Sequence, residues 1–291
     1  MHNKEVTEDG IYVRLYIEDA AESTRFLIDT GACVSVLPIA DFKRLFPEDI
    51  AIKDCLLANG KRARVTEPRE IIFCTECKQQ FKLLVRGAEV PVPILGLDFV
   101  YFCEIVADIT GVMSIQYCCW GSRLTLKGCV LNHNPDNQCL PPPPPLPVPV
   151  RSGIIGEFST DRSNRKKLLL DSGSVGNFLE WSYLPDISRG VTIMRTDFTA
   201  ADGDAFYATD EKDVVLYHGD KRRYNEVPLT MQGCDLDSEF VDFIACGILG
   251  REFVERCCFY QYTGGVMGLR AVVYYGDDDD ITIATFDPLK K

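Results

Sequence analysis

The chain has 291 residues, of which 46% are hydrophobic and 25% charged, and its formal net charge is −12 at pH 7. This composition is typical of a folded globular protein long enough for two domains, and the excess of acid argues against nucleic acid as a partner. No run of about twenty apolar residues is present, so we expect no membrane span. The first nine residues are polar and lack the apolar core of a signal peptide, which predicts a cytoplasmic or other intracellular protein.

Short strands are predicted throughout the first half of the chain. Strand-like runs lie, in chain order, at residues 11–17, 24–28, 56–65, 70–74, 80–85 and 93–96, and residues 108–115 are predicted to close the unit with a hairpin. The run at 56–65 contains Asn59-Gly60, a pair that favours a hairpin turn. A helical turn or loop is expected at 40–46 and a short amphipathic helix after Gly96. The pattern as a whole predicts a β-rich unit with one short helix.

A single acid follows an apolar strand in the stretch 26–38. Residues 26–28 are apolar, Asp29, Thr30, Gly31 and Ala32 come next, and a second apolar run follows. A carboxylate at the end of a buried strand is costly because desolvation disfavours its charged form. Such an acid is retained mainly for chemistry or because a partner satisfies it. Taken alone, however, Asp-Thr-Gly is also an ordinary turn after a strand.

A proline-rich segment separates the two halves of the chain. Residues 141–145 are five consecutive prolines, and two more follow before residue 150. Prolines favour an extended conformation and cannot donate to a sheet, so residues 140–150 are predicted to be a semi-rigid spacer. The predicted domains are therefore 1–139 and 151–291. A polyproline ligand for a partner's aromatic groove is the alternative interpretation.

The second half repeats five landmarks of the first half in the same order. The matched pairs are 10–15 with 153–158, Asp29 with Asp171, 57–60 with 199–203, 94–100 with 247–254, and 110–113 with 263–267. Such ordered self-similarity indicates an internal duplication, so we predict an all-β chain of two similar lobes. One departure is that Gly176-Asn177 interrupts the apolar run after Ser174, where the first half has Ser35-Val36.

The duplicated acids suggest a twofold pairing. If the two turns meet on the axis, Asp29 and Asp171 face each other. Like charges ~3 Å apart cannot both ionise, so the pair shares one proton, as in aspartic proteases. One carboxylate can then take a proton from a bound water while the other donates one to a substrate carbonyl.

These motifs resemble those of retropepsins, the aspartic protease domains of retroviruses and of Ty3/gypsy-type retrotransposons. The resemblance covers about residues 10–116 and, more faintly, about 153–270. It implies two pseudo-symmetric retropepsin- or pepsin-like lobes with the active site at their interface and with Asp29 and Asp171 as the catalytic pair. It also implies supporting roles in the active-site turns for Thr30, Gly31, Ala32, Ser172, Gly173 and Ser174, and roles in substrate-covering flaps for Asn59, Gly60, Asp202 and Gly203.

The implied activity is hydrolysis of a peptide bound in an extended conformation, with a retroelement polyprotein as a candidate substrate and with no cofactor. Retropepsins usually carry one lobe per chain and dimerise, whereas this chain carries both lobes, as pepsins do. We therefore expect a monomer with intramolecular lobe pairing. The alternative assembly pairs lobe one with lobe one of a second copy. The alternative function is a non-catalytic peptide-binding module on a degenerate protease fold.

A metal site is not expected. Cys74 and Cys77 have the spacing of half a zinc site, but no second Cys-x-x-Cys or His-x-x-x-His completes it. Thirteen cysteines in a chain without an export signal are interpreted as reduced thiols rather than as a disulfide framework.

Overall fold

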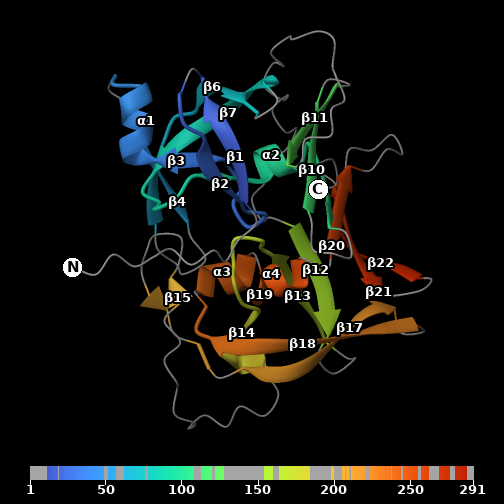
Figure 1. Cartoon of the computed structure of the whole chain (residues 1–291). Helices are drawn as coiled ribbons and strands as arrows, with labels where there is room; N and C mark the ends of the chain where they lie inside the picture. Colours follow the sequence, from blue (N-terminus) through green and yellow to red (C-terminus); the bar gives the residue numbers. More distant parts are fainter. Residues whose placement is uncertain are drawn as a thin grey trace.

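The structure is a computed structural model in which most of the predicted strands are present (Figure 1). The residues it describes are 12–18, 20–48, 52–56, 62–75, 78–107, 113–119, 122–127, 154–159, 164–183, 198–199, 205–206, 208–209, 211–220, 223–236, 238–243, 245–254, 257–261, 269–275 and 279–286. The predicted spacer 140–150, the landmark 263–267 and Cys77 lie outside these residues, as do the predicted flap residues Asn59, Gly60, Asp202 and Gly203. The described part is an all-β structure with two lobes.

Eight of the described strands form the sheet of the first lobe, in the order β3-β8-β2-β1-β6-β7-β5-β4. They are β1 (Tyr12–Ile17), β2 (Thr24–Ile28), β3 (Val36–Pro38), β4 (Ile52–Leu56), β5 (Arg62–Thr66), β6 (Arg69–Cys74), β7 (Gln80–Ala88) and β8 (Ile94–Leu95). Two helices accompany them, α1 (Ile39–Leu45) and α2 (Leu97–Val100).

The core of the first lobe follows from side-chain alternation along these strands. In β7 the buried residues Phe81, Leu83 and Val85 alternate with more exposed ones, as expected for a strand with one face on a core. Phe81 stacks on Phe73 of β6 with ring centroids 5.5 Å apart. It also contacts Phe99 of α2 at 6.0 Å, so the short helix closes the core directly behind β8.

The second lobe contains a closed barrel in the order β12-β13-β19-β14-β18-β17. Its strands are β12 (Ile154–Ser159), β13 (Arg165–Leu170), β14 (Phe178–Glu180), β17 (Lys212–Asp220), β18 (Arg223–Cys234) and β19 (Gly247–Leu249). The other described elements of this lobe are η1 (Trp181–Tyr183), β15 (Phe198–Thr199), β16 (Ala205–Phe206), α3 (Ser238–Phe243) and α4 (Arg251–Val254).

The two lobes share one pattern of strand pairing. The strand that precedes each acid runs parallel to the Ile-Leu strand, as β2 does to β8 and β13 to β19. The strand after each acid runs antiparallel to the same Ile-Leu strand, as β3 does to β8 and β14 to β19. It also runs parallel to a long strand, as β3 does to β7 and β14 to β18. The repeat seen in the sequence therefore has a matching repeat in topology.

A third sheet joins the two halves of the chain. Its order is β11-β10-β9-β20-β21-β22, so three described strands come from each half (Figure 1). The strands are β9 (Cys103–Ala107), β10 (Met113–Cys119), β11 (Ser122–Lys127), β20 (Cys257–Gln261), β21 (Leu269–Tyr275) and β22 (Asp279–Phe286). The halves meet where β9 pairs with β20, with Ile105 opposite Phe259. The sequence did not predict this shared sheet.

The predicted hairpins are present in their described strands. In the first lobe β4 and β5 pair through Leu56 opposite Arg62, which leaves 57–61 as the connection. In the second lobe β15 and β16 pair through Thr199 opposite Ala205, which leaves 200–204. The prediction of one short helix in each half was wrong, because the described part of each lobe contains two α-helices. Within the described residues, no helix combines the length and hydropathy needed to cross a bilayer.

Candidate active site

The two predicted acids occupy equivalent positions in their lobes. Asp29 follows the last residue of β2, and Asp171 follows the last residue of β13. The Asp29 N–H donates to the carbonyl of Leu95 at 3.0 Å, and the Asp171 N–H donates to the carbonyl of Leu249 at 2.9 Å. Parallel pairing with β8 or β19 therefore fixes where the backbone leaves the sheet after β2 and after β13. This places each acid at the end of its strand.

Thr30 and Ser172 bind the two turns to each other. The Thr30 hydroxyl accepts the Ser172 N–H at 2.9 Å and donates to the Leu170 carbonyl at 2.8 Å. The Ser172 hydroxyl accepts the Thr30 N–H at 3.0 Å and donates to the Ile28 carbonyl at 2.6 Å. Both side chains are buried, so these four reciprocal bonds are shielded from water. The turns of the two lobes thus meet on a local twofold axis.

Each carboxylate is held by the backbone of its own turn. Asp29 Oδ1 accepts the N–H groups of Gly31 at 2.8 Å and Ala32 at 3.1 Å. Asp171 Oδ1 accepts the N–H groups of Gly173 at 2.9 Å and Ser174 at 3.2 Å. A carboxylate oriented by two backbone donors keeps a fixed geometry, which general acid–base chemistry requires.

The glycine of each turn lies against the carboxylate of the other lobe. A Cβ placed at Gly31 would come within 2.5 Å of Asp171 Cγ, and one placed at Gly173 within 2.6 Å of Asp29 Cγ. These separations are far below van der Waals contact. Glycine is therefore required at both positions for the two acids to approach one another.

The charges of the two acids are coupled. Burial raises the pKa of Asp171 well above its ordinary value, and the negative charge of Asp29 and a side-chain hydrogen bond to Asp29 raise it further. The N–H donors of Gly173 and Ser174 oppose this rise. Asp29 and Asp171 are each, as whole residues, only partly buried. The pair can therefore hold one proton between two oxygens.

The structure brings together all eight residues that were predicted for the two turns: Asp29, Thr30, Gly31, Ala32, Asp171, Ser172, Gly173 and Ser174. Ser174 adds one detail, since its hydroxyl donates to the carbonyl of Gly176 at 3.0 Å.

Ser35 and Asp98 form a second layer behind the Asp29 turn, which the sequence interpretation missed. The Ser35 N–H donates to Asp98 Oδ2 at 2.9 Å, and its hydroxyl donates to Asp98 Oδ1 at 2.6 Å. The same hydroxyl accepts the Gly96 N–H at 3.0 Å. Burial raises the pKa of Asp98 to about 6, although the Ser35 donors and Arg86 oppose the rise. The signal in the sequence was an acid in the first turn of the short helix α2.

Asn177 takes the place of Ser35 in the second lobe. Each residue lies six positions after its acid, and Asn177 Oδ1 accepts the Gly250 N–H at 2.9 Å as Ser35 accepts that of Gly96. The Asn177 amide also donates to the Thr230 carbonyl at 3.0 Å. The sequence comparison set Gly176-Asn177 opposite Ser35-Val36, whereas the structure sets Asn177 opposite Ser35. Ser35 and Asn177 differ in type but hold the same backbone group.

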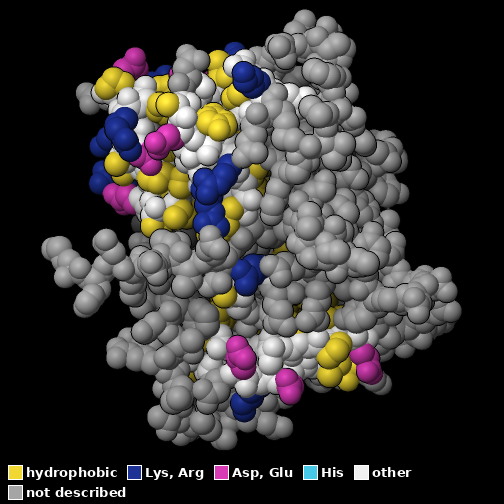
Figure 2. Space-filling view, viewed as in Figure 1, with side chains coloured by type: hydrophobic (Ala, Val, Ile, Leu, Met, Phe, Trp, Pro, Cys, Tyr) yellow, Lys and Arg dark blue, Asp and Glu magenta, His cyan; other side chains and the backbone are white. Residues whose placement is uncertain are grey.

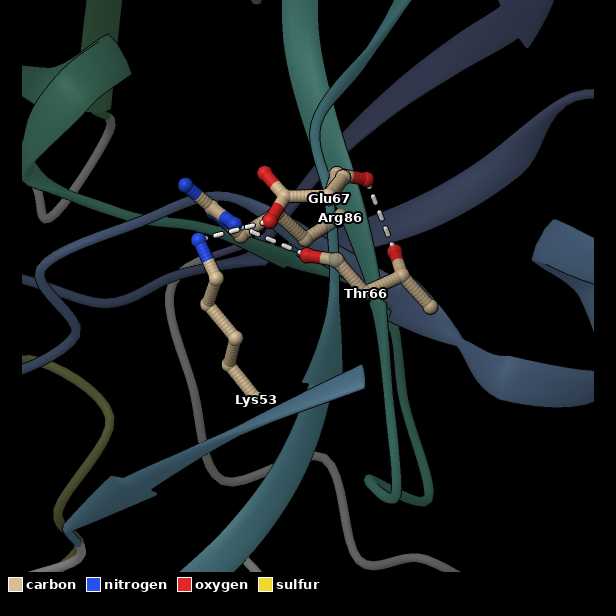
Figure 3. A network of polar contacts seen from close by, with 4 residues as sticks. All are labelled: Lys53, Thr66, Glu67 and Arg86. Carbon is tan, nitrogen blue, oxygen red and sulfur yellow. Dashed lines mark hydrogen bonds and ion pairs between the residues drawn. The ribbon is translucent and has the colours of Figure 1, made fainter. Parts of the chain in front are cut away.

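Two threonines anchor the bases of the predicted flap hairpins. The Gly87 N–H donates to the Thr66 hydroxyl at 2.8 Å, and the Gly233 N–H donates to the Thr209 hydroxyl at 2.7 Å. In the first lobe further bonds surround this anchor (Figure 3). Arg86 donates to the Thr66 carbonyl at 2.8 Å, and Lys53 pairs with Glu67 at 2.6 Å. The β4–β5 hairpin is thus attached to β7 by side chains as well as by the sheet.

Apolar side chains line the surroundings of the Asp29 turn. Val36, Ala88 and Ile94 form a small buried cluster that is separate from the main core. The partly buried side chains packed against it are Leu27, Ala32, Val34, Val65, Val90 and Val92. This cluster joins the turn that carries Asp29 to β5, the second strand of the hairpin. Ala32 and Val34, which follow Asp29 in the chain, are thus packed against this cluster.

Charged side chains of both signs intermingle on the described surface of the first lobe (Figure 2). Its basic residues form ion pairs, including Arg64 with Glu89, Arg69 with Glu48 and Lys82 with Glu70. Within the described ranges, His, Cys, Asp and Glu side chains do not gather in any group of three or more that could hold a metal ion.

No known protein-family model matches the sequence, and no curated protein matches it either.

Proposed function

We propose that this protein is an aspartic endopeptidase with retropepsin-like lobes and that its catalytic pair is Asp29 and Asp171. The observation that carries the proposal is the reciprocal bonding of Thr30 and Ser172 across the lobe interface, which places the two acids against each other's glycine. Two like charges are costly in such a place. A pair that only held the lobes together would be more stable as two neutral side chains.

The mechanism follows from a shared proton. The deprotonated carboxylate takes a proton from a water molecule held between the acids, and the water oxygen attacks the peptide carbonyl carbon. The protonated carboxyl donates its proton to the carbonyl oxygen, which gives a tetrahedral gem-diol. Proton transfer to the amide nitrogen then breaks the C–N bond and releases an amine and a carboxylic acid. The pair titrates as a unit, so neither acid has a fixed role.

The substrate is an extended polypeptide. Strands β4 and β5 provide a hairpin beside the Asp29 turn, and an extended peptide can add to such an edge through main-chain hydrogen bonds. The apolar cluster around Ala32, Val34 and Val65 favours apolar side chains next to the cleaved bond. A retroelement polyprotein, the candidate that the sequence resemblance suggests, supplies segments of this kind. With both lobes in one chain, a monomer contains a complete site.

Cleavage of a peptide library tests the proposal. The wild-type protein is incubated with the library across pH 3–8, beside Asp29→Asn and Asp171→Asn, and products are identified by mass spectrometry. Asp213→Asn is the control, because Asp213 is an exposed acid on β17. We expect cleavage by the wild type and the control, and a loss of at least about 10³-fold in either active-site variant. Cleavage at the wild-type rate by one active-site variant would refute the mechanism, and binding without cleavage would favour a peptide-binding module.

A further inference from the structure

The turn that carries Asp29 rests on the N-terminal end of α2. The Leu97 N–H donates to the Ala32 carbonyl at 2.8 Å. A Cβ placed at Gly96 would lie 2.6 Å from the Val34 carbonyl carbon, so the turn and this glycine are in direct backbone contact. The second lobe repeats the arrangement with Arg251 N–H donating to the Ser174 carbonyl at 2.7 Å. The position of each catalytic acid therefore depends on how its turn is seated at this junction.

Asp98 is the residue that closes the junction in the first lobe. Its two oxygens each accept one bond from Ser35, at 2.9 Å from the backbone N–H and 2.6 Å from the hydroxyl. Ser35 is fully buried, so without Asp98 it would keep an unpaired backbone donor. Ser35 in turn accepts the Gly96 N–H at 3.0 Å. One side chain thus ties the exit of the active-site turn to the helix that supports it.

The second lobe places Asn177, six positions after Asp171, at the same junction. Asn177 binds the Gly250 N–H with its own amide oxygen and anchors its amide nitrogen on the Thr230 carbonyl of β18. Asn177 thus ties the second turn to the backbone of β18, and Asp98 ties the first turn to α2. Removing the partner of Ser35 should therefore disturb one turn more than the other.

We propose that Asp98 is a positioning residue for Asp29, acting through Ser35, and that the Asp171 turn is positioned separately by Asn177. This assignment rests on the proposed peptidase function only where activity is the readout. Asp98 does not touch the reacting atoms. Its effect is to hold Ser35, where the chain leaves the turn, in place. The N–H groups of Gly31 and Ala32 then keep their hydrogen bonds to Asp29 Oδ1.

The test compares two substitutions of Asp98. Asn is isosteric with Asp and keeps both contacts, because its oxygen can accept the Ser35 N–H and its amide can donate to the Ser35 hydroxyl. Leu retains similar volume but makes neither bond. With cleavage of a fluorogenic peptide, we expect Asp98→Leu to lower kcat by about tenfold to a hundredfold with KM changed less than about twofold. Asp98→Asn should restore kcat to within about twofold of the wild type. Glu70→Ala, which removes an exposed ion pair in the same lobe, is the control.

A second readout needs no activity. Amide hydrogen exchange is measured by NMR at the Asp29 turn and at the Asp171 turn. Asp98→Leu should accelerate exchange at Gly31 and Ala32 at least about tenfold more than at Gly173 and Ser174. Asn177→Leu should produce the reverse pattern.

The outcomes separate the two proposals. Equal exchange in both turns of Asp98→Leu, or a kcat per folded molecule equal to that of the wild type, would overturn the assignment of Asp98. A wild-type protein that cleaves no peptide would refute the proposed function. In that case the contrast between the two turns in hydrogen exchange still decides whether Asp98 positions Asp29.

Discussion

Replacing Thr30 with valine should separate the hydroxyl's contribution from that of side-chain shape. Valine has nearly the same volume as threonine and preserves the packing at the lobe interface. It removes the acceptor of the Ser172 N–H and the donor to the Leu170 carbonyl, which lie 2.9 and 2.8 Å from the Thr30 hydroxyl. Both groups belong to bonds that are buried in the structure, so water does not readily replace the lost partner.

The expected cost follows from these two bonds. A buried polar group left without a partner costs about 1–3 kcal/mol, so two such groups cost about 2–6 kcal/mol. Thr30→Ser is the matched control. It keeps the hydroxyl and removes one methyl group, which costs about 1 kcal/mol. A native domain has a total stability of about 5–15 kcal/mol, so the valine substitution removes a large share of it.

Urea denaturation followed by circular dichroism measures this difference. We expect Thr30→Val to lower the free energy of unfolding by at least about 2 kcal/mol more than Thr30→Ser. Because the lost bonds join the two lobes, calorimetry also shows whether the lobes of Thr30→Val unfold in one transition or in two. If the two variants differed by less than about 0.5 kcal/mol, the reasoning about buried cross-lobe bonds would be wrong.

Three further predictions follow from the site. Gly31→Ala should lower kcat at least about a hundredfold in the peptide assay, because the new Cβ displaces the Asp171 carboxyl, and wild-type kcat would contradict this. The raised pKa of Asp98, about 6 against an ordinary 3.8, contributes stability that is complete below about pH 4 and is lost as pH rises through 6. The loss amounts to up to about 3 kcal/mol in urea titrations, and Asp98→Asn should flatten it. Thr66→Val should cost about 1–3 kcal/mol, since it leaves a buried backbone N–H unpaired, whereas Lys53→Ala should leave the melting temperature nearly unchanged.

The sequence was sufficient to predict the turns because their residues are contiguous. Asp29 to Ala32 and Asp171 to Ser174 are short motifs at the ends of apolar strands, and the ordered landmarks around them indicate two similar lobes. Strand-like flanks were likewise enough to predict that β4 and β5 pair. These are local patterns, and the order and spacing of residues in the sequence are enough to predict them.

The supporting residues could not be predicted in the same way, because their partners are distant in the chain. Asp98 meets Ser35 across 63 positions, and Thr66 meets Gly87 across 21. The equivalence of Ser35 and Asn177 could not be predicted because they are different residue types. Only the structure shows that each accepts the N–H of the equivalent glycine, Gly96 or Gly250. The shared six-stranded sheet was missed because strand pairing between halves leaves no periodic signal.

The difference between Ser35 and Asn177 has an evolutionary consequence. In a homodimer every substitution appears twice, so a change that suits one side of a symmetric site is imposed on the other side as well. In this chain the two copies are encoded separately and already carry different residues, Ser35 and Asn177, at the same place in their turns. Selection can therefore change the surroundings of one acid while those of the other stay the same. Under the proposed function, the two sides of the site can then be fitted separately to the two sides of an asymmetric peptide.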